Sequence, residues 1–103
     1  MKNFLEDLNK AFENRVRLGI MSILAVNDFV DFGTLKEQLQ ITDGNLASHI
    51  LALEKLEYIQ TKKEFVGKKP KTSFAASGKG KIAFNAHLQA LEKLMKDLYK
   101  QKS

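Results

Sequence analysis

Apolar side chains recur three and four residues apart along most of the chain, which is the period of an α-helix with one buried face. The first such stretch predicts a short N-terminal helix that leads into a longer one, with Asn14 as the N-cap of the longer helix and an end near Val26. A second helix is expected to begin after Asp31 and to place Leu35 and Leu39 on its apolar side. The N-terminal part of the chain is therefore expected to be mostly helical.

A third helix has a clear start signal at Thr42. The Thr42 hydroxyl can accept backbone N–H groups of a first helical turn, and Ile41 and Leu46 have the spacing of a hydrophobic staple around it. The helix is predicted to cover residues 43–57. Its apolar side is expected to contain Leu46, Ile50 and Leu53, and its polar side Asn45, Ser48, His49, Ala52 and Lys55.

Two strand-like segments follow this helix. Residues 58–65 and 72–76 are rich in β-branched and aromatic side chains, and the segment from Gly67 to Pro70 lies between them. Glycine readily adopts the unusual backbone angles of a tight turn, and proline donates no backbone hydrogen bond. We therefore expect a hairpin with a turn of Gly67, Lys68, Lys69 and Pro70, and no strand through the proline.

The remaining elements complete a mainly α pattern of the α+β class. Phe29 and Val30 predict a short strand between the first two long helices, and Ser77 is expected to cap a last helix over residues 78–100. The order helix, short strand, helix, tight turn, helix, hairpin, helix is that of a winged helix-turn-helix. The sequence thus predicts a single domain over residues 1–103, with a three-helix core and a β-hairpin wing at residues 58–76.

Composition agrees with one small globular domain and excludes several kinds of chemistry. The chain is 44% hydrophobic and 28% charged, and it has no cysteine, so disulfides, thiolate metal sites and cysteine nucleophiles are excluded. His49 and His87 are far apart in sequence, so neither a metal site nor a cofactor is expected. No apolar run approaches the roughly 18 residues of a membrane span, and the N-terminus turns acidic where a signal peptide would be apolar. A cytoplasmic protein with no membrane partner is expected.

Positive charge is concentrated in one segment. Residues 60–81 hold seven lysines and one acid, Glu64, a net charge of +6, so the rest of the chain carries −1 of the total of +5. A basic hairpin beside a helix with a polar face is typical of proteins that bind nucleic acid. A lysine-rich hairpin by itself is also common as a solvated tip. Its position directly after the third helix favours nucleic-acid binding.

Several runs of residues resemble those of a known family. Residues 45–59 resemble the recognition helix and following strand of MarR/ArsR-type bacterial and archaeal transcriptional regulators. Residues 67–72 resemble the wing of the small, single-domain members, and residues 14–24 resemble their first core helix. Ser77 and Gly80 resemble the opening of their last helix, so the resemblance covers roughly residues 12 to 98.

The sequence departs from this family at two positions. Ser48 stands where these proteins often carry an arginine, and Glu57 stands where they usually have a glycine that ends the helix in a left-handed conformation. A residue with a Cβ atom is strained in that conformation.

The resemblance implies a sequence-specific, prokaryotic transcriptional regulator that binds double-stranded DNA. The recognition helix would lie in the major groove, and the basic wing would contact the backbone or the minor groove. We expect Asn45, Ser48 and His49 to read bases. The full set of expected DNA-binding residues is Thr42, Gly44, Asn45, Ser48, His49, Lys55, Lys62, Lys68, Lys69, Lys71 and Thr72.

The first and last helices have apolar faces beyond what a three-helix core can cover. A homodimer would bury them and place two recognition helices about 34 Å apart, which matches a palindromic site with one helical turn between half-sites. A small-molecule effector could bind between the helices and the dimer interface. The residues expected at this interface are Phe4, Leu5, Leu8, Leu88, Leu91, Met95 and Leu98.

Alternatives remain open at this point. The same fold could serve as a protein-interaction module without specific DNA binding, whereas no residue spacing supports an enzyme. Arg15 and Arg17 would either contact phosphates or form a salt bridge to an acid such as Glu37 or Glu54. His87 is expected at a dimer interface or at the edge of the core. The packing residues of the hairpin base are expected to be Tyr58, Phe65 and Phe74, and these aromatic side chains are not expected to stack on bases.

Overall fold

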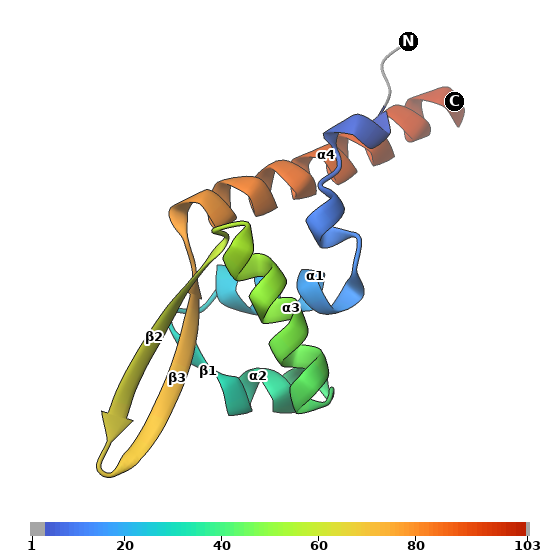
Figure 1. Ribbon diagram of the computed structural model, residues 1–103. Coiled ribbons are helices and arrows are strands. Elements are labelled where there is room, and N and C mark those ends of the chain that lie inside the picture. Colours follow the sequence, from blue (N-terminus) through green and yellow to red (C-terminus); the bar gives the residue numbers. More distant parts are fainter. Residues whose placement is uncertain (1–3, 103) are drawn as a thin grey trace.

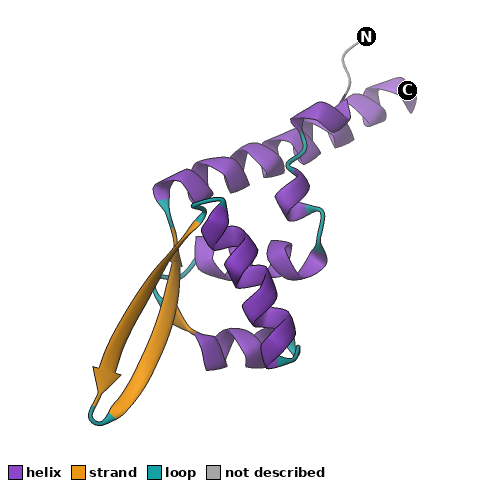
Figure 2. Cartoon of the chain, in the orientation of Figure 1, coloured by secondary structure: helices purple, strands orange, loops and turns teal. Residues whose placement is uncertain are grey.

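The computed structural model describes residues 4–102 as helices packed around a small sheet (Figure 1). Figure 2 shows that helix predominates and that strands are confined to the hairpin and one short partner. The expected winged helix-turn-helix is confirmed. Its elements, in chain order, are η1 (Phe4–Asp7), η2 (Lys10–Phe12), α1 (Arg15–Ala25), β1 (Val30–Asp31), α2 (Phe32–Leu39), α3 (Asp43–Lys55), β2 (Ile59–Val66), β3 (Lys69–Ala76) and α4 (Gly78–Lys102).

The N-terminal segment differs from the expected α-helix, because it forms the two short 3₁₀ helices η1 and η2. The Asn9 side chain accepts a hydrogen bond from the backbone N–H of Ala11, and the Asn14 side chain accepts from the backbone N–H groups of Val16 and Arg17. Each asparagine therefore starts a new turn and ends the preceding one, which is the usual competition of asparagine with the helical backbone. The prediction of Asn14 as the cap of α1 is confirmed.

The core lies where α1, α2 and α3 meet the base of the sheet. The buried side chains predicted for α3, Leu46, Ile50 and Leu53, all belong to it. The largest side chains with no more than 1% exposure are Ile20, Met21, Leu24, Leu35, Leu46 and Leu53. Because these side chains come from all three helices, their packing fixes the orientation of α3 relative to α1 and α2.

The sheet has the strand order β1-β3-β2, with all pairs antiparallel. β2 and β3 form a regular ladder from the pair Ile59–Ala76 to the pair Val66–Lys69, joined by a two-residue turn. The expectation that Pro70 breaks the strand is wrong, because Pro70 pairs with Phe65 inside the ladder. β1 pairs with β3 only near the base, so the outer part of β3 has an open edge, where proline is tolerated.

Both turns that flank α3 use a residue with positive φ. Gln40 ends α2 at φ 54°, and Glu57 follows the Leu56 C-cap of α3 at φ 62°. The helix therefore ends at Lys55, two residues earlier than expected, and the strained conformation inferred for Glu57 is confirmed.

The last helix, α4, is tied to the end of α3 at its first turn. The Ser77 hydroxyl donates to the carbonyl of Glu57 and accepts from the N–H of Gly80, which confirms Ser77 as the cap. From there α4 runs along one side of the molecule, and η1 lies beside its C-terminal half (Figure 1). Within residues 4–102, no helix has an apolar stretch long enough to cross a membrane.

Candidate nucleic-acid interface

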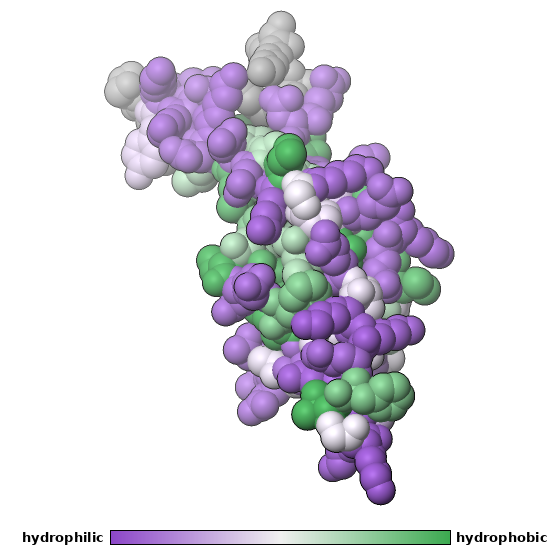
Figure 3. Space-filling model, turned by 90° about the vertical axis from the view of Figure 1, so that its left-hand side faces the viewer, coloured by the Kyte–Doolittle hydropathy of each residue, from purple (hydrophilic) through white to green (hydrophobic). Residues whose placement is uncertain are grey.

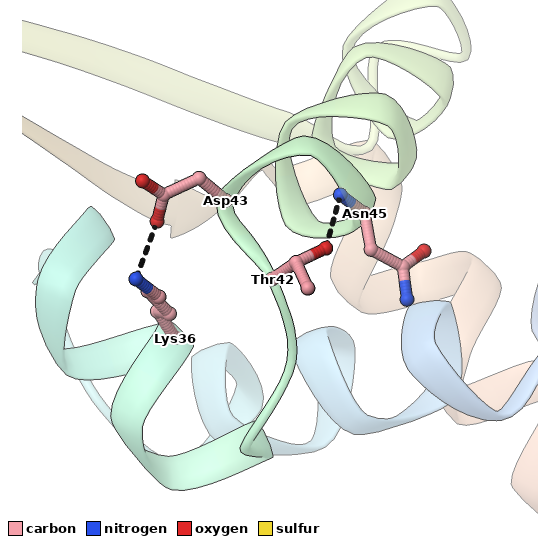
Figure 4. A network of polar contacts seen from close by, with 4 residues as sticks. All are labelled: Lys36, Thr42, Asp43 and Asn45. Carbon is pink, nitrogen blue, oxygen red and sulfur yellow. Dashed lines mark hydrogen bonds and ion pairs between the residues drawn. The ribbon is translucent and has the colours of Figure 1, made fainter.

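The N-terminus of α3 is built by a side-chain cap and an ion pair (Figure 4). The Thr42 hydroxyl accepts a hydrogen bond of 3.2 Å from the backbone N–H of Asn45, as expected for the cap. Lys36 of α2 places its Nζ 2.9 Å from Oδ1 of Asp43, so the acid at the first position of α3 is paired. The Asn45 side chain points away from this pair and is exposed, which leaves its amide free to contact a ligand.

The exposed stripe of α3 differs from the one expected. Ser48 is exposed as predicted, but its neighbours on the outer face are Ala47 and Leu51, and the Leu51 side chain is 53% exposed. Successive residues of a helix are rotated by about 100° around its axis, so Ser48 and Leu51 lie on the side opposite Leu46, Ile50 and Leu53. His49 lies only about 70° around the axis from the middle of those three buried residues. The helical periodicity of the sequence therefore predicts Leu51 as a residue of the exposed face and His49 as a residue at its edge.

His49 is half-buried between α3 and α1. Nη1 of Arg17 lies 3.2 Å from Nδ1 of His49, and Nε of Arg17 donates to the carbonyl of Ala11 at 2.7 Å. Burial, and next the positive charge of Arg17, lower the pKa of His49 below its ordinary value of 6.5. Among the described residues, Arg17 forms these hydrogen bonds instead of the salt bridge to Glu37 or Glu54 that was one of two expectations.

Lys55 lies at the other end of α3 from Asn45. Ten residues of helix separate the two, which is about 15 Å along the axis. Lys55 lines a shallow hollow together with Asn9, Lys10, Ala11, Arg17, Ala52 and Leu56. The structure thus places Lys55 beside η2 and away from the N-terminal turn of α3.

The wing carries exposed lysines on both faces and at its turn. Lys69 and Lys71 lie on one face of β3, and Lys68 occupies the turn next to Gly67, whose φ of 67° suits glycine. Lys62 lies closer to the body, because its Nζ lies 5.1 Å from the centre of the Phe29 ring. The same Nζ lies 3.8 Å from Oε2 of Glu64, two residues further along β2. Thr72 is half-buried.

The N-terminus of α3 and the tip of the wing point toward the same end of the molecule, and α4 crosses the opposite end (Figure 1). A polar helix end and a basic hairpin tip are therefore presented toward the same end of the molecule. A family model described as a winged helix DNA-binding domain matches residues 16–95. The chain belongs to this family.

The proteins and solved structures that are similar to this chain match most of its length. An uncharacterized protein of Methanocaldococcus jannaschii is 34% identical over 89 residues, which are 86% of this chain and 97% of the relative. The solved structure of a transcriptional regulator homologue from Pyrococcus horikoshii has a TM-score of 0.83 and 30% identity, over 92% of this chain and 96% of that one. A MarR-like transcription regulator from Bacillus cereus has a TM-score of 0.69 and 20% identity, over 91% of this chain and 70% of that one.

The basic segment of this winged helix is divided by the fold. Lys79 and Lys81 belong to the first turn of α4, at the far end of the hairpin from its tip. The hairpin itself keeps Lys62, Lys63, Lys68, Lys69 and Lys71 against one acid, Glu64. The charge at the wing is thus smaller than the sequence segment suggested, and it includes Lys63, which sequence reasoning had not selected.

The apolar residues expected at a dimer interface lie on the surface of this winged-helix domain. Leu5, Leu88, Leu91, Met95 and Leu98 are exposed, and Leu8 is half-buried. The side chain of Phe4 lies outside the described part of the structure. His87, in contrast, is buried at the edge of the core, as one alternative predicted, and its Nδ1 accepts from the N–H of Asn9.

No group of three or more side chains that could hold a metal ion occurs within residues 4–102.

Proposed function

We propose that this chain is a sequence-specific, double-stranded DNA-binding transcriptional regulator that acts in the cytoplasm as a homodimer. The observation that carries the proposal is the shared direction of the α3 N-terminus and the wing tip (Figure 1). A helix that enters the major groove and a basic hairpin on the flanking backbone need this arrangement. The family match and the regulators among its structural neighbours support the same function.

Sequence reading is assigned to the exposed face of α3. Asn45 and Ser48 are exposed, and their side chains can donate and accept hydrogen bonds at base edges. Leu51, on the same face, can make apolar contact with a thymine methyl group. Thr42 and Gly44, in the exposed first turn, lie where backbone N–H groups contact phosphate.

His49 would contribute from the edge of this surface. Arginine can only donate, so Nδ1 of His49 accepts from Arg17, and in the neutral ring the proton is on Nε2. Nε2 can then donate to a base or a phosphate. Lys55 would add a backbone contact beyond the base-reading end.

The wing would supply most of the affinity, and α3 would make the hydrogen bonds to bases. Its lysines, with Lys62 and Thr72 nearer the base, can contact phosphates on either side of the site read by α3. If each dimer neutralises on the order of 6 to 10 phosphates, affinity should fall by roughly 10³ to 10⁵ between 50 and 200 mM salt.

A homodimer would bury the exposed apolar side of α4. Four of the expected interface residues, Leu88, Leu91, Met95 and Leu98, share this helix with Tyr99. Tyr99 is also exposed and lines a hollow with Met95, Leu98 and Gln101. Large exposed apolar patches usually mark a partner surface. A two-fold dimer through α4 would hold two copies of α3 about one helical turn of DNA apart and thus favour a palindromic operator.

Fluorescence anisotropy with a random-sequence duplex, titrated over a salt series, tests the proposal. We expect binding that weakens steeply with salt, and selection from a random duplex library should then enrich a palindromic motif. Absence of binding at low salt would overturn DNA binding and favour the alternative of a protein-interaction module. Retained binding with no enriched motif would overturn the sequence-specific part.

Two triple variants separate the wing from the total charge. Replacement of Lys68, Lys69 and Lys71 by alanine should weaken binding to all duplexes and lower the salt slope by roughly one unit for each lost phosphate contact. Replacement of Lys79, Lys81 and Lys93, which lie on α4, changes the net charge equally and should have a much smaller effect. Equal effects of the two variants would contradict the role of the wing.

A further inference from the structure

Phe65 occupies an unexpected position near the tip of the wing. Its side chain is 75% exposed, and the expectation that it packs in the hairpin base is wrong, whereas Phe74 and Tyr58 do pack there. Phe65 is too far along the strand to contact the core. It lies six residues, or about 20 Å, beyond Ile59, which is the only buried residue of β2. An aromatic ring held in solvent adds nothing to the core, and exposed apolar surface rimmed by polar residues often marks a contact site.

The strand register gives the ring a defined direction. Side chains alternate between the two faces of a strand, so Phe65 shares a face with Thr61 and Lys63. The Thr61 hydroxyl donates to Oε2 of Glu54 in α3 at 2.8 Å, so this face of the wing is the one that faces α3. Pro70, which pairs with Phe65 across the ladder, lies on the same face.

Cations surround this apolar pair. Lys63 lies on its own face of the hairpin, Lys68 is in the turn beyond it, and Lys69 and Lys71 lie on the opposite face. Figure 3 shows the wing tip at the lower end of the molecule, with apolar surface directly beside strongly hydrophilic surface. A groove with phosphate walls and an apolar stack of bases between them is complementary to this pattern.

We propose that Phe65 is an apolar wedge that enters the minor groove next to the α3 site and partly unstacks one base step. This inference rests on the proposed DNA-binding function and assigns a second role to the wing. The lysines attract the backbone, and the Phe65 ring, with Pro70 beside it, displaces a base from its neighbour and kinks the duplex by about 20° or more toward the major groove.

The wedge has a consequence for sequence preference. Pyrimidine–purine steps such as TA and CA/TG unstack more easily than other steps. The wing should therefore favour such a step at a fixed distance from the bases that α3 reads. This preference arises from deformability and requires no hydrogen bond from the wing to a base.

The test compares Phe65→Ala with Val66→Ala on one duplex, the sequence most enriched from a random library by the wild-type protein. Val66 is the matched control, because it is the adjacent apolar residue, is 58% exposed and lies on the other face of β2. Energy transfer between dyes at the duplex ends reports the bend, and anisotropy over a salt series reports affinity. Circular dichroism melting of each variant confirms that it is folded.

Phe65→Ala should straighten the duplex and weaken binding roughly 5- to 100-fold, the range for loss of a base-stacking aromatic side chain. Its salt slope should equal that of the wild type, because no phosphate contact is lost. Val66→Ala should keep both the bend and the affinity. Phe65→Lys should also lose the bend, even though it adds a cation that can attract phosphate.

An unchanged bend and affinity in Phe65→Ala would overturn the wedge while leaving DNA binding intact. Failure of the wild type to bind any duplex would instead overturn the proposed function, and the wedge with it. A lipid surface is the other target for an aromatic ring among lysines. Phe65-dependent sedimentation with phosphatidylserine–phosphatidylcholine vesicles, together with an unchanged DNA bend, would also overturn the wedge.

Discussion

Nη1 of Arg17 in α1 lies 3.2 Å from Nδ1 of His49 in α3, which links the first core helix directly to the helix proposed to read DNA. Because guanidinium groups cannot accept hydrogen bonds, the contact requires an unprotonated Nδ1. The contact therefore fixes both the position of the ring and its tautomer.

The pKa of His49 should be measurably low. Burial is the larger cause and the Arg17 charge the smaller, so Arg17→Met should raise the pKa only part of the way toward 6.5. An NMR titration of the imidazole Cε1 proton in wild type and variant measures this. A wild-type pKa above 6.5 would contradict the assignment.

Stability should depend on pH through the same group. Because the pKa of His49 is lower in the folded protein than in the unfolded chain, the unfolded chain binds the proton more readily. The free energy of unfolding should therefore be highest above about pH 6.5 and should fall as the pH drops toward the folded-state value. Urea unfolding between pH 7.5 and pH 5 measures the slope, and His49→Gln should reduce it.

Gly80 is required by close packing, whereas Gly78 is not. A Cβ atom at Gly80 would overlap the backbone carbonyl of Tyr58, but a Cβ atom at Gly78 meets nothing within 4 Å. Gly80→Ala should thus destabilise the fold by about 2 kcal/mol or more. Gly78→Ala should be neutral or slightly stabilising, because alanine favours a helix. Thermal or urea unfolding compares the two, and equal effects would refute the close approach.

Glu57 carries backbone strain that glycine would relieve. The φ of Glu57 is 62°, an angle that glycine adopts without strain. Glu57→Gly should therefore raise the free energy of unfolding by roughly 0.5 to 1 kcal/mol. Glu13→Gly is the matched control, because Glu13 has an ordinary φ of −74° and should lose stability through the added freedom of the unfolded chain. A destabilised Glu57→Gly protein would show that the carboxylate itself contributes.

If the protein is a dimer through α4, one charged residue introduced on this helix should convert the dimer to a monomer. The wild type should sediment as a dimer at micromolar concentration, and Met95→Lys should shift it toward monomer because a lysine would be buried without a partner. Ile82→Lys, at an exposed apolar position of α4 outside the proposed interface, should remain dimeric. A wild-type monomer would contradict the proposal.

Much of the fold follows from local chemistry that the sequence displays. Asn14 and Thr42 start helices because their side chains accept first-turn N–H groups, and the spacing of Leu46, Ile50 and Leu53 fixes which side of α3 is buried. The prediction that no strand passes through Pro70 was wrong. The rule that excludes proline from strands applies to central ladders, and only the paired structure shows that β3 has an open edge there.

The sequence by itself determined the order of elements, the caps and the presence of a basic hairpin, because these depend on neighbours within a few residues. Tertiary structure decided what each surface residue faces. In the folded protein His49 contacts Arg17, and Lys79 and Lys81 lie in α4, away from the wing tip. The Phe65 side chain is exposed to solvent. These outcomes depend on the angle between α1 and α3 and on how far the hairpin extends past the core, and both are set by packing between residues distant in sequence.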